Sequence, residues 1–166
     1  LLFKPSTTGF KMGALADAAF ACGWGAELPP SPGSAKPRAG YILEVASCPA
    51  LWVSKLQPTI AASTMEAEYA ALPVPLRAAA PLLGLAKQAA AGLGAGNARR
   101  ALASQATAHE DNQGALKLAT LEEGRCTPRS KFYALRLHWL RSWLRRPSGG
   151  TGAELIGTKL QKAGML

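Results

Sequence analysis

The chain has 166 residues, the length of one domain, and 48% of them are hydrophobic, which excludes a disordered tail and a membrane protein with several spans. Its 19 Lys and Arg residues outnumber 10 Asp and Glu residues and give a net charge of +9. This surplus favours a polyanionic partner, nucleic acid before an acidic membrane.

Residues 1–9, LLFKPSTTG, contain no charged segment followed by a long apolar run, so they do not resemble a secretory signal. We expect them to be a linker from an upstream domain, with a single domain at 10–166. The three cysteines lie far apart and form no Cys-x-x-Cys pair, which argues against a zinc site and favours reduced thiols in an intracellular setting.

The first third of the domain predicts three short strands. Residues 10–27 form an apolar strand that ends in a glycine-bounded turn, and 28–40 is a loop rich in Pro, Gly and Ser. β-Branched and aromatic residues predict the next strand at 40–48, and alternation predicts another at 51–57 after a turn at Pro49. The strands are expected to form an antiparallel meander.

A helix is predicted from Ser63, because Ser63 and Glu66 match the capping-box pattern of a hydroxyl followed three residues later by Glu. Pro73 and Pro75 predict a kink or break. An Ala/Leu pattern resumes the helix over 76–93 and ends at glycines. Lys87 and Gln88 make this apolar stretch a poor membrane span, and we expect no membrane partner.

The last third alternates strands and helices. We expect a short strand within 98–111, a helix at 112–124, a strongly amphipathic helix at 130–146 and a last strand at 153–158. A run of strands followed by alternating helices and strands predicts an α/β fold, a mixed sheet with helices packed on it.

The few acidic residues fall at informative places. Asp17 lies in the first apolar strand, Glu66 and Glu68 lie on the first helix, and Asp111 follows a strand and precedes a helix. Taken singly, each acid is more often structural or solvated. Taken together, an Asp on the first strand, a Glu on the first helix and an Asp after the fourth strand can hold divalent cations such as Mg²⁺.

Five segments, in the same order, resemble the ribonuclease H domain of copia-type LTR retrotransposon polyproteins. Together they span most of 10–166, and any one alone would be a weak signal. The segments are ADAAFA at 16–21, GY at 40–41 with WVSKLQPT at 52–59, ASTMEAEYAAL at 62–72, EDNQGA at 110–115, and RSKFY at 129–133 with LHWLR at 137–141.

The resemblance implies a ribonuclease H-like fold, a five-stranded mixed sheet flanked by helices. It also implies hydrolysis of the RNA strand of an RNA–DNA hybrid by two-metal catalysis with Mg²⁺, Mn²⁺ being possible. Asp17, Glu68 and Asp111 would be catalytic and hold the metal; Glu68, not Glu66, precedes the family's Tyr-x-Ala-Leu. The expected partner is an upstream reverse transcriptase of the same polyprotein, inside the cell, in a cytoplasmic virus-like particle or the nucleus.

The fourth carboxylate of the family is missing. Its C-terminal Gln-x-Ala-Asp corresponds to QKAG at 161–164, so Gly164 stands where the Asp should be, and the last helix is expected to be truncated. Whether the chain is an enzyme stays open at this point. The alternatives are a catalytically degenerate remnant that only binds nucleic acid or packs against a neighbouring domain, and a basic scaffold without a nucleic-acid role.

Segment 125–146 contains seven basic residues and no acidic one. Its tryptophans are expected to face the core, while some of its basic side chains contact phosphates. The residues predicted to bind nucleic acid are Arg125, Arg129, Lys131, Arg136 and Arg141.

Overall fold

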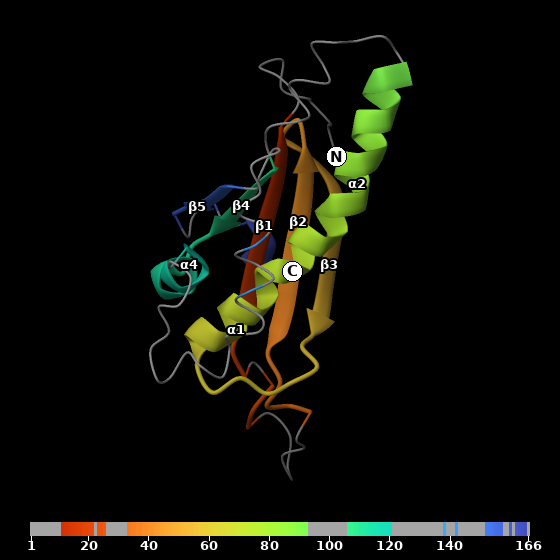
Figure 1. The fold of residues 1–166 in the computed structure, drawn as a ribbon. Coiled ribbons are helices and arrows are strands. Elements are labelled where there is room, and N and C mark those ends of the chain that lie inside the picture. Colours follow the sequence, from red (N-terminus) through yellow and green to blue (C-terminus); the bar gives the residue numbers. More distant parts are fainter. Residues whose placement is uncertain are drawn as a thin grey trace.

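The computed structural model describes residues 11–21, 23–25, 33–92, 106–120, 138, 142, 152–157, 160 and 162–165. A five-stranded sheet with the order β3-β2-β1-β4-β5 forms its centre (Figure 1). The predicted α/β fold with a five-stranded mixed sheet is confirmed. The elements are β1 (Met12–Ala19), β2 (Arg38–Val45), β3 (Cys48–Leu56), α1 (Thr64–Ala71), α2 (Pro73–Gly92), β4 (Ala106–Glu110), α4 (Gln113–Thr120), β5 (Gly152–Leu155) and the 3₁₀ helix η3 (Lys162–Met165).

The first three strands form the expected antiparallel meander, since β1 pairs with β2 and β2 with β3 in opposite directions. β1 is shorter than the predicted strand at 10–27. It ends at Ala19, and the chain turns at Ala21, which has a φ of 44° and whose carbonyl accepts a hydrogen bond from the Trp24 N–H.

The turn between β2 and β3 lies earlier than the one predicted at Pro49. Ala46 and Ser47 make it, with φ values of 51° and 66°. Two residues with positive φ match the twist of the flanking strands in a tight hairpin. Pro49 instead lies within β3 opposite Glu44, where the register shifts, a position that tolerates the missing N–H of proline.

Capping and proline chemistry set the boundary between the two helices, and the predicted start at Ser63 and interruption at Pro73 are confirmed. The Ser63 hydroxyl accepts a hydrogen bond from the Glu66 N–H at 3.1 Å and caps α1. The helix ends at Ala71, and α2 begins at Pro73, three residues before the predicted start at 76, because proline suits the first turn of a helix. Pro75 lies in this first turn and causes no separate break, and Pro81 lies inside α2.

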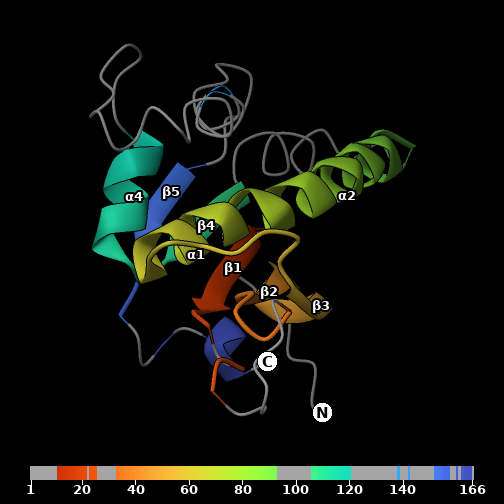
Figure 2. The same ribbon diagram turned by 90° about the horizontal axis from the view of Figure 1, so that it is seen from below.

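The helices and η3 lie on opposite faces of the sheet. Helices α1 and α2 cross one face, whereas η3 lies against β1 on the other (Figure 2). On the helix side, small strand residues such as Ala14 and Ala16 pack with Leu43, Tyr69 and Leu72 in the main core. On the other side, Ala163 of η3 is buried and Lys162 pairs with Glu44 of β2.

Among the described residues, one helical stretch, Thr64–Ala86, is long and apolar enough to cross a membrane by length and composition. Within it, Tyr69, Leu72 and Leu76 are buried in the core against the sheet. A core helix of a soluble domain passes the same test, so the stretch is weak evidence for a membrane segment.

Two predicted segments lie completely or mostly outside the described residues. The linker at 1–9 lies there completely. Of the amphipathic helix at 130–146, the structure describes His138 and Ser142, both helical.

Ser63→Ala should lower the free energy of unfolding by about 1 kcal/mol, because the variant loses the hydroxyl that caps α1. Urea denaturation measures the loss. Ser63→Asp is the matched control, since Asp caps a helix as well as Ser does, and it should retain most of the stability. Equal losses in both variants would contradict the capping role.

Candidate metal centre

The register between β1 and β4 brings two carboxylates to one edge of the sheet. These strands are parallel, and the pairing runs from Met12 with Ala106 to Leu15 with His109. Asp17 and Asp111 each lie two residues beyond the last pair. Because parallel neighbours point their carboxyl ends the same way, both side chains emerge at the same edge.

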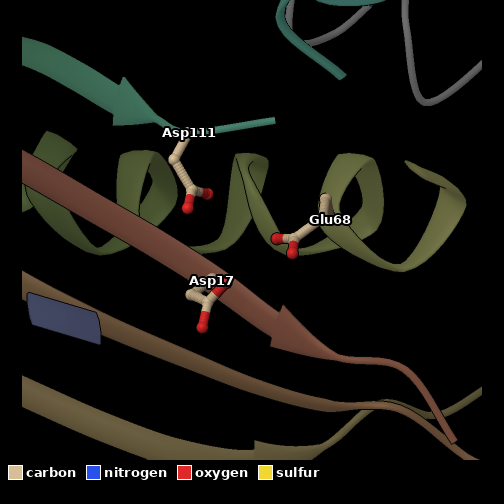
Figure 3. A group of neighbouring side chains, drawn as sticks. All are labelled: Asp17, Glu68 and Asp111. Carbon is tan, nitrogen blue, oxygen red and sulfur yellow. The ribbon is translucent and has the colours of Figure 1, made fainter. Parts of the chain in front are cut away.

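Glu68 completes the group from α1, which packs on β1 and against α4. One carboxylate oxygen from each of Asp17, Glu68 and Asp111 lies within 4.8 Å of the other two. Figure 3 shows the three side chains converging from β1, α1 and the segment after β4. The structure therefore brings together all three acidic residues that the sequence predicts for the site.

Glu66, the other acid of α1, forms hydrogen bonds at the N-terminus of the helix and is not part of the cluster. Its carboxylate accepts a hydrogen bond from the Ala62 N–H at 2.6 Å, and its own N–H donates to Ser63. Glu66 thus stabilises the start of α1, although its carboxylate bonds to the N–H of Ala62 and not to that of the N-cap residue Ser63 as in a regular capping box, while Glu68 belongs to the cluster.

Sequence reasoning missed a fourth acid beside the cluster. Glu110, the last residue of β4, is 0% exposed, and its Oε1 accepts a hydrogen bond from the Asn112 N–H at 3.0 Å. Asn112 in turn caps α4, since its Oδ1 accepts from the N–H groups of Gly114 and Ala115. The hydrogen bond that the Asn112 N–H donates to Glu110 holds the turn that carries Asp111. The available signal was strand alternation, which puts Glu110 on the same face as the buried Ala106 and Ala108.

Burial and mutual repulsion make the two glutamates weak acids. Burial, followed by the charges of Glu110 and Asp17, raises the pKa of Glu68 to about 9. Burial, opposed by the hydrogen bond from Asn112 and aided by the charge of Asp111, raises the pKa of Glu110 to about 8. At neutral pH the cation-free site therefore holds protons on both side chains.

The residues fit a divalent metal ion. Carboxylate oxygens are the ligands that Mg²⁺ and Mn²⁺ prefer. Glu68 is 6% exposed, and its Oε2 has no hydrogen-bond partner, so a buried acceptor is left unsatisfied next to two more carboxylates. A bound cation would satisfy this oxygen and offset the repulsion that keeps the site protonated.

The other predicted site residues are not part of this geometry. Gly164 lies in η3, which packs against β1, the strand of Asp17. The five residues predicted to bind nucleic acid lie outside the described part of the chain. They are Arg125, Arg129, Lys131, Arg136 and Arg141.

Comparison with known proteins identifies the fold. No family model and no curated protein matches the sequence. Three solved structures are similar along nearly the whole chain. The N-terminal RNase H domain of Rv2228c from Mycobacterium tuberculosis matches with a TM-score of 0.51 and 14% identity, and the match covers 92% of this chain and 86% of that chain. RNase H1 from the halophilic archaeon Halobacterium salinarum NRC-1 matches with a TM-score of 0.53 and 15% identity, covering 92% of this chain and 90% of that chain. LC11-RNase H1 in complex with an RNA/DNA hybrid matches with a TM-score of 0.57 and 12% identity, covering 94% of this chain and 93% of that chain.

The chain therefore has the ribonuclease H-like fold expected from the resemblance. At 12–15% identity the likeness shows the fold alone.

The metal-free protein should lose stability as the pH rises from 5.5 to 7.5. The unfolded chain releases the protons of Glu68 and Glu110 near pH 4.5, while the folded protein keeps them until about 9 and 8. The folded state then binds more protons, so the free energy of unfolding falls, by up to about 1.4 kcal/mol per pH unit for each group. Urea denaturation in EDTA measures the decline.

The matched control is the double variant Glu68→Gln with Glu110→Gln, which cannot titrate at either position. Its stability should change much less over the same pH range and should exceed that of the parent at pH 7.5. An equal decline in parent and variant would show that other groups cause the pH dependence.

Proposed function

We propose that this domain hydrolyses the RNA strand of RNA–DNA hybrids with the help of divalent cations. The observation that carries the proposal is the meeting of Asp17, Glu68 and Asp111 within 4.8 Å on a ribonuclease H-like fold. The RNase H1 structure that resembles this chain with a TM-score of 0.57 was solved with an RNA/DNA hybrid, which supports this class of substrate.

In this proposal Asp17, Glu68 and Asp111 hold Mg²⁺, or Mn²⁺ in its place. When bound, the cations supply positive charge that helps to activate a water molecule and to stabilise the leaving 3′ oxygen of the phosphodiester. The chain itself supplies a fixed set of ligands. The pairing of β1 with β4 fixes the positions of the two aspartates relative to each other. The hydrogen bond from the Asn112 N–H to Glu110 holds the turn between β4 and α4, which carries Asp111.

Recognition of the hybrid would depend on its backbone and not on its base sequence. Basic side chains contact phosphates, and 2′-hydroxyl groups distinguish RNA from DNA. The net charge of +9 and the basic segment 125–146 support this mode of binding. Arg125, Arg129, Lys131, Arg136 and Arg141 remain the residues proposed for it.

The five ordered motifs further support a place in a copia-type retrotransposon polyprotein. In that setting a reverse transcriptase domain of the same polyprotein makes the hybrid, and this domain removes its RNA strand. The proposed place of action is inside the cell, in a virus-like particle in the cytoplasm or in the nucleus.

A second function is favoured by Gly164, which offers no ligand where the family carries its fourth carboxylate. In this alternative the domain keeps the fold and binds nucleic acid, or packs against a neighbouring domain, without cleaving. Loss of one ligand from a two-metal site weakens the hold on one of the ions, because each cation needs several oxygen ligands.

Replacing any one carboxylate of the cluster should abolish cleavage of a labelled RNA–DNA hybrid in Mg²⁺ or Mn²⁺. Asp17→Asn, Glu68→Gln and Asp111→Asn should each lower the cleavage rate by more than about 100-fold. Replacing residues that only hydrogen-bond to metal ligands already lowers metal affinity or activity by about 10- to 100-fold. Glu66→Gln is the matched control on the same helix and should cleave as the parent does.

Salt-dependent binding of the hybrid separates the two functions. If the parent cleaves and Asp17→Asn only binds, the domain is the proposed nuclease. If the parent binds the hybrid but cleaves no faster than Asp17→Asn, the nuclease proposal is wrong and the binding remnant is favoured. If Glu66→Gln loses as much activity as Glu68→Gln, the assignment of the cluster is wrong.

Gly164→Asp should raise the cleavage rate, by roughly tenfold or more, if an absent ligand limits the site. The substitution adds a carboxylate in η3, which packs against the strand of Asp17. Gly157→Asp is a matched control, because an added side chain there meets nothing within 4 Å and should leave the rate unchanged. Equal rates in both variants would show that position 164 is not a ligand position.

A further inference from the structure

A concave site that contains none of the three clustered carboxylates lies on the helix side of the sheet. It is a pocket of about 790 Å³ between β2, β3 and the start of α2, within the range of about 300–1,000 Å³ typical of small-ligand sites. Tyr41 and Val53, which are opposite each other on β2 and β3, line it together with Val74 of α2. Figure 1 shows α2 lying across these two strands.

The charged side chains among the described residues of this pocket carry one sign. Lys36, Lys55 and Arg77 line it from the loop before β2, from β3 and from α2, and the described residues of the lining include no acidic one. Lys55 and Arg77 are exposed and Lys36 is half-buried. Three cations from separate elements favour an anionic ligand, while the tyrosine ring and the aliphatic side chains favour a flat apolar group.

The pocket and the carboxylate cluster occupy the same end of the sheet. Gly40 of β2 pairs with Asp17 of β1, and its neighbours Ala39 and Tyr41 both line the pocket. Neighbouring strands lie about 4.8 Å apart, and successive side chains alternate between the two faces, so Tyr41 points to the helix side while Asp17, opposite Gly40, points to the other face of the same end. On α1, Glu68 belongs to the cluster and Ala70 to the pocket, about 200° apart around the helix axis.

We propose that this pocket binds an unpaired nucleotide of the nucleic acid that the domain holds. Its base packs on Tyr41 and the apolar wall, and its phosphates contact Lys55, Arg77 and Lys36. A nucleotide combines a flat face with a phosphate, which matches this lining better than an acidic peptide does. The inference rests on the proposed function only in that one nucleic acid would occupy both sites.

Fluorescence anisotropy with a labelled six-nucleotide oligothymidylate, in EDTA to exclude cleavage, tests the pocket. Lys55→Gln with Arg77→Gln should weaken binding roughly tenfold at 0.1 M salt and reduce the salt slope by about 1.4, because each phosphate contact to a single strand contributes about 0.7. Lys11→Gln with Lys117→Gln removes the same charge at two exposed positions outside the pocket and should have little effect.

Tyr41→Leu tests the flat surface apart from the charge. It should weaken binding by roughly fivefold or more, the lower end of what one stacked base contributes, without changing the salt slope. A hybrid with a six-nucleotide overhang should bind more tightly than a blunt hybrid, and the gain should vanish in the Lys55/Arg77 variant. Thymidine monophosphate in excess should compete only weakly, since a free nucleotide lacks the rest of the strand.

Equal binding by the pocket and control double variants would overturn the proposal, as would an equal affinity for blunt and overhanging hybrids. Tight binding of the free nucleotide without a preference for the oligonucleotide would also overturn it. Cleavage by the parent, with its loss in Asp17→Asn, is measured separately. The binding and cleavage assays therefore test the pocket proposal and the nuclease proposal separately, and either proposal can be overturned without the other.

Discussion

The parallel pairing of β1 with β4 determines where the chemistry of this domain can occur. It joins segments 94 residues apart in sequence, since Met12 pairs with Ala106, and it places Asp17 and Asp111 at the same end of the sheet. A parallel pair cannot be joined by a tight turn, so the chain between them must cross over, and α1 lies on that crossover with Glu68. A shift of one residue in this register would separate the carboxylates.

The same arrangement costs stability. Glu68 and Glu110 are buried near two aspartates, and burial is the largest cause of the raised pKa of each. A native site that keeps mutually repelling acids close together is less stable than a neutral one of the same shape, and this cost is typical of functional sites. Protons or a cation relieve the repulsion, so the occupancy of the site and the stability of the fold are thermodynamically linked.

Local signals in the sequence predicted the elements well, because their causes are local. The hydroxyl of Ser63 starts α1 and the ring of Pro73 separates α1 from α2, and both effects act within one turn. The hairpin at Ala46 and Ser47 was misplaced because neither residue type signals positive φ. Glu110 was missed because alternation gives only its face of β4, while its burial also depends on the position of β4 between β1 and β5, which is not a local property. The grouping of Asp17, Glu68 and Asp111 came from resemblance to a family.

The two edges of the sheet are poorly suited to strand addition. β5 has four residues, and β3 carries Pro49 at a register shift and an exposed Lys55. Short strands, proline, bulges and lysine all discourage a foreign strand from extending a sheet. Aggregation through these edges is thereby disfavoured, and a neighbouring domain of a longer polypeptide would have to dock through helices or loops instead of continuing the sheet.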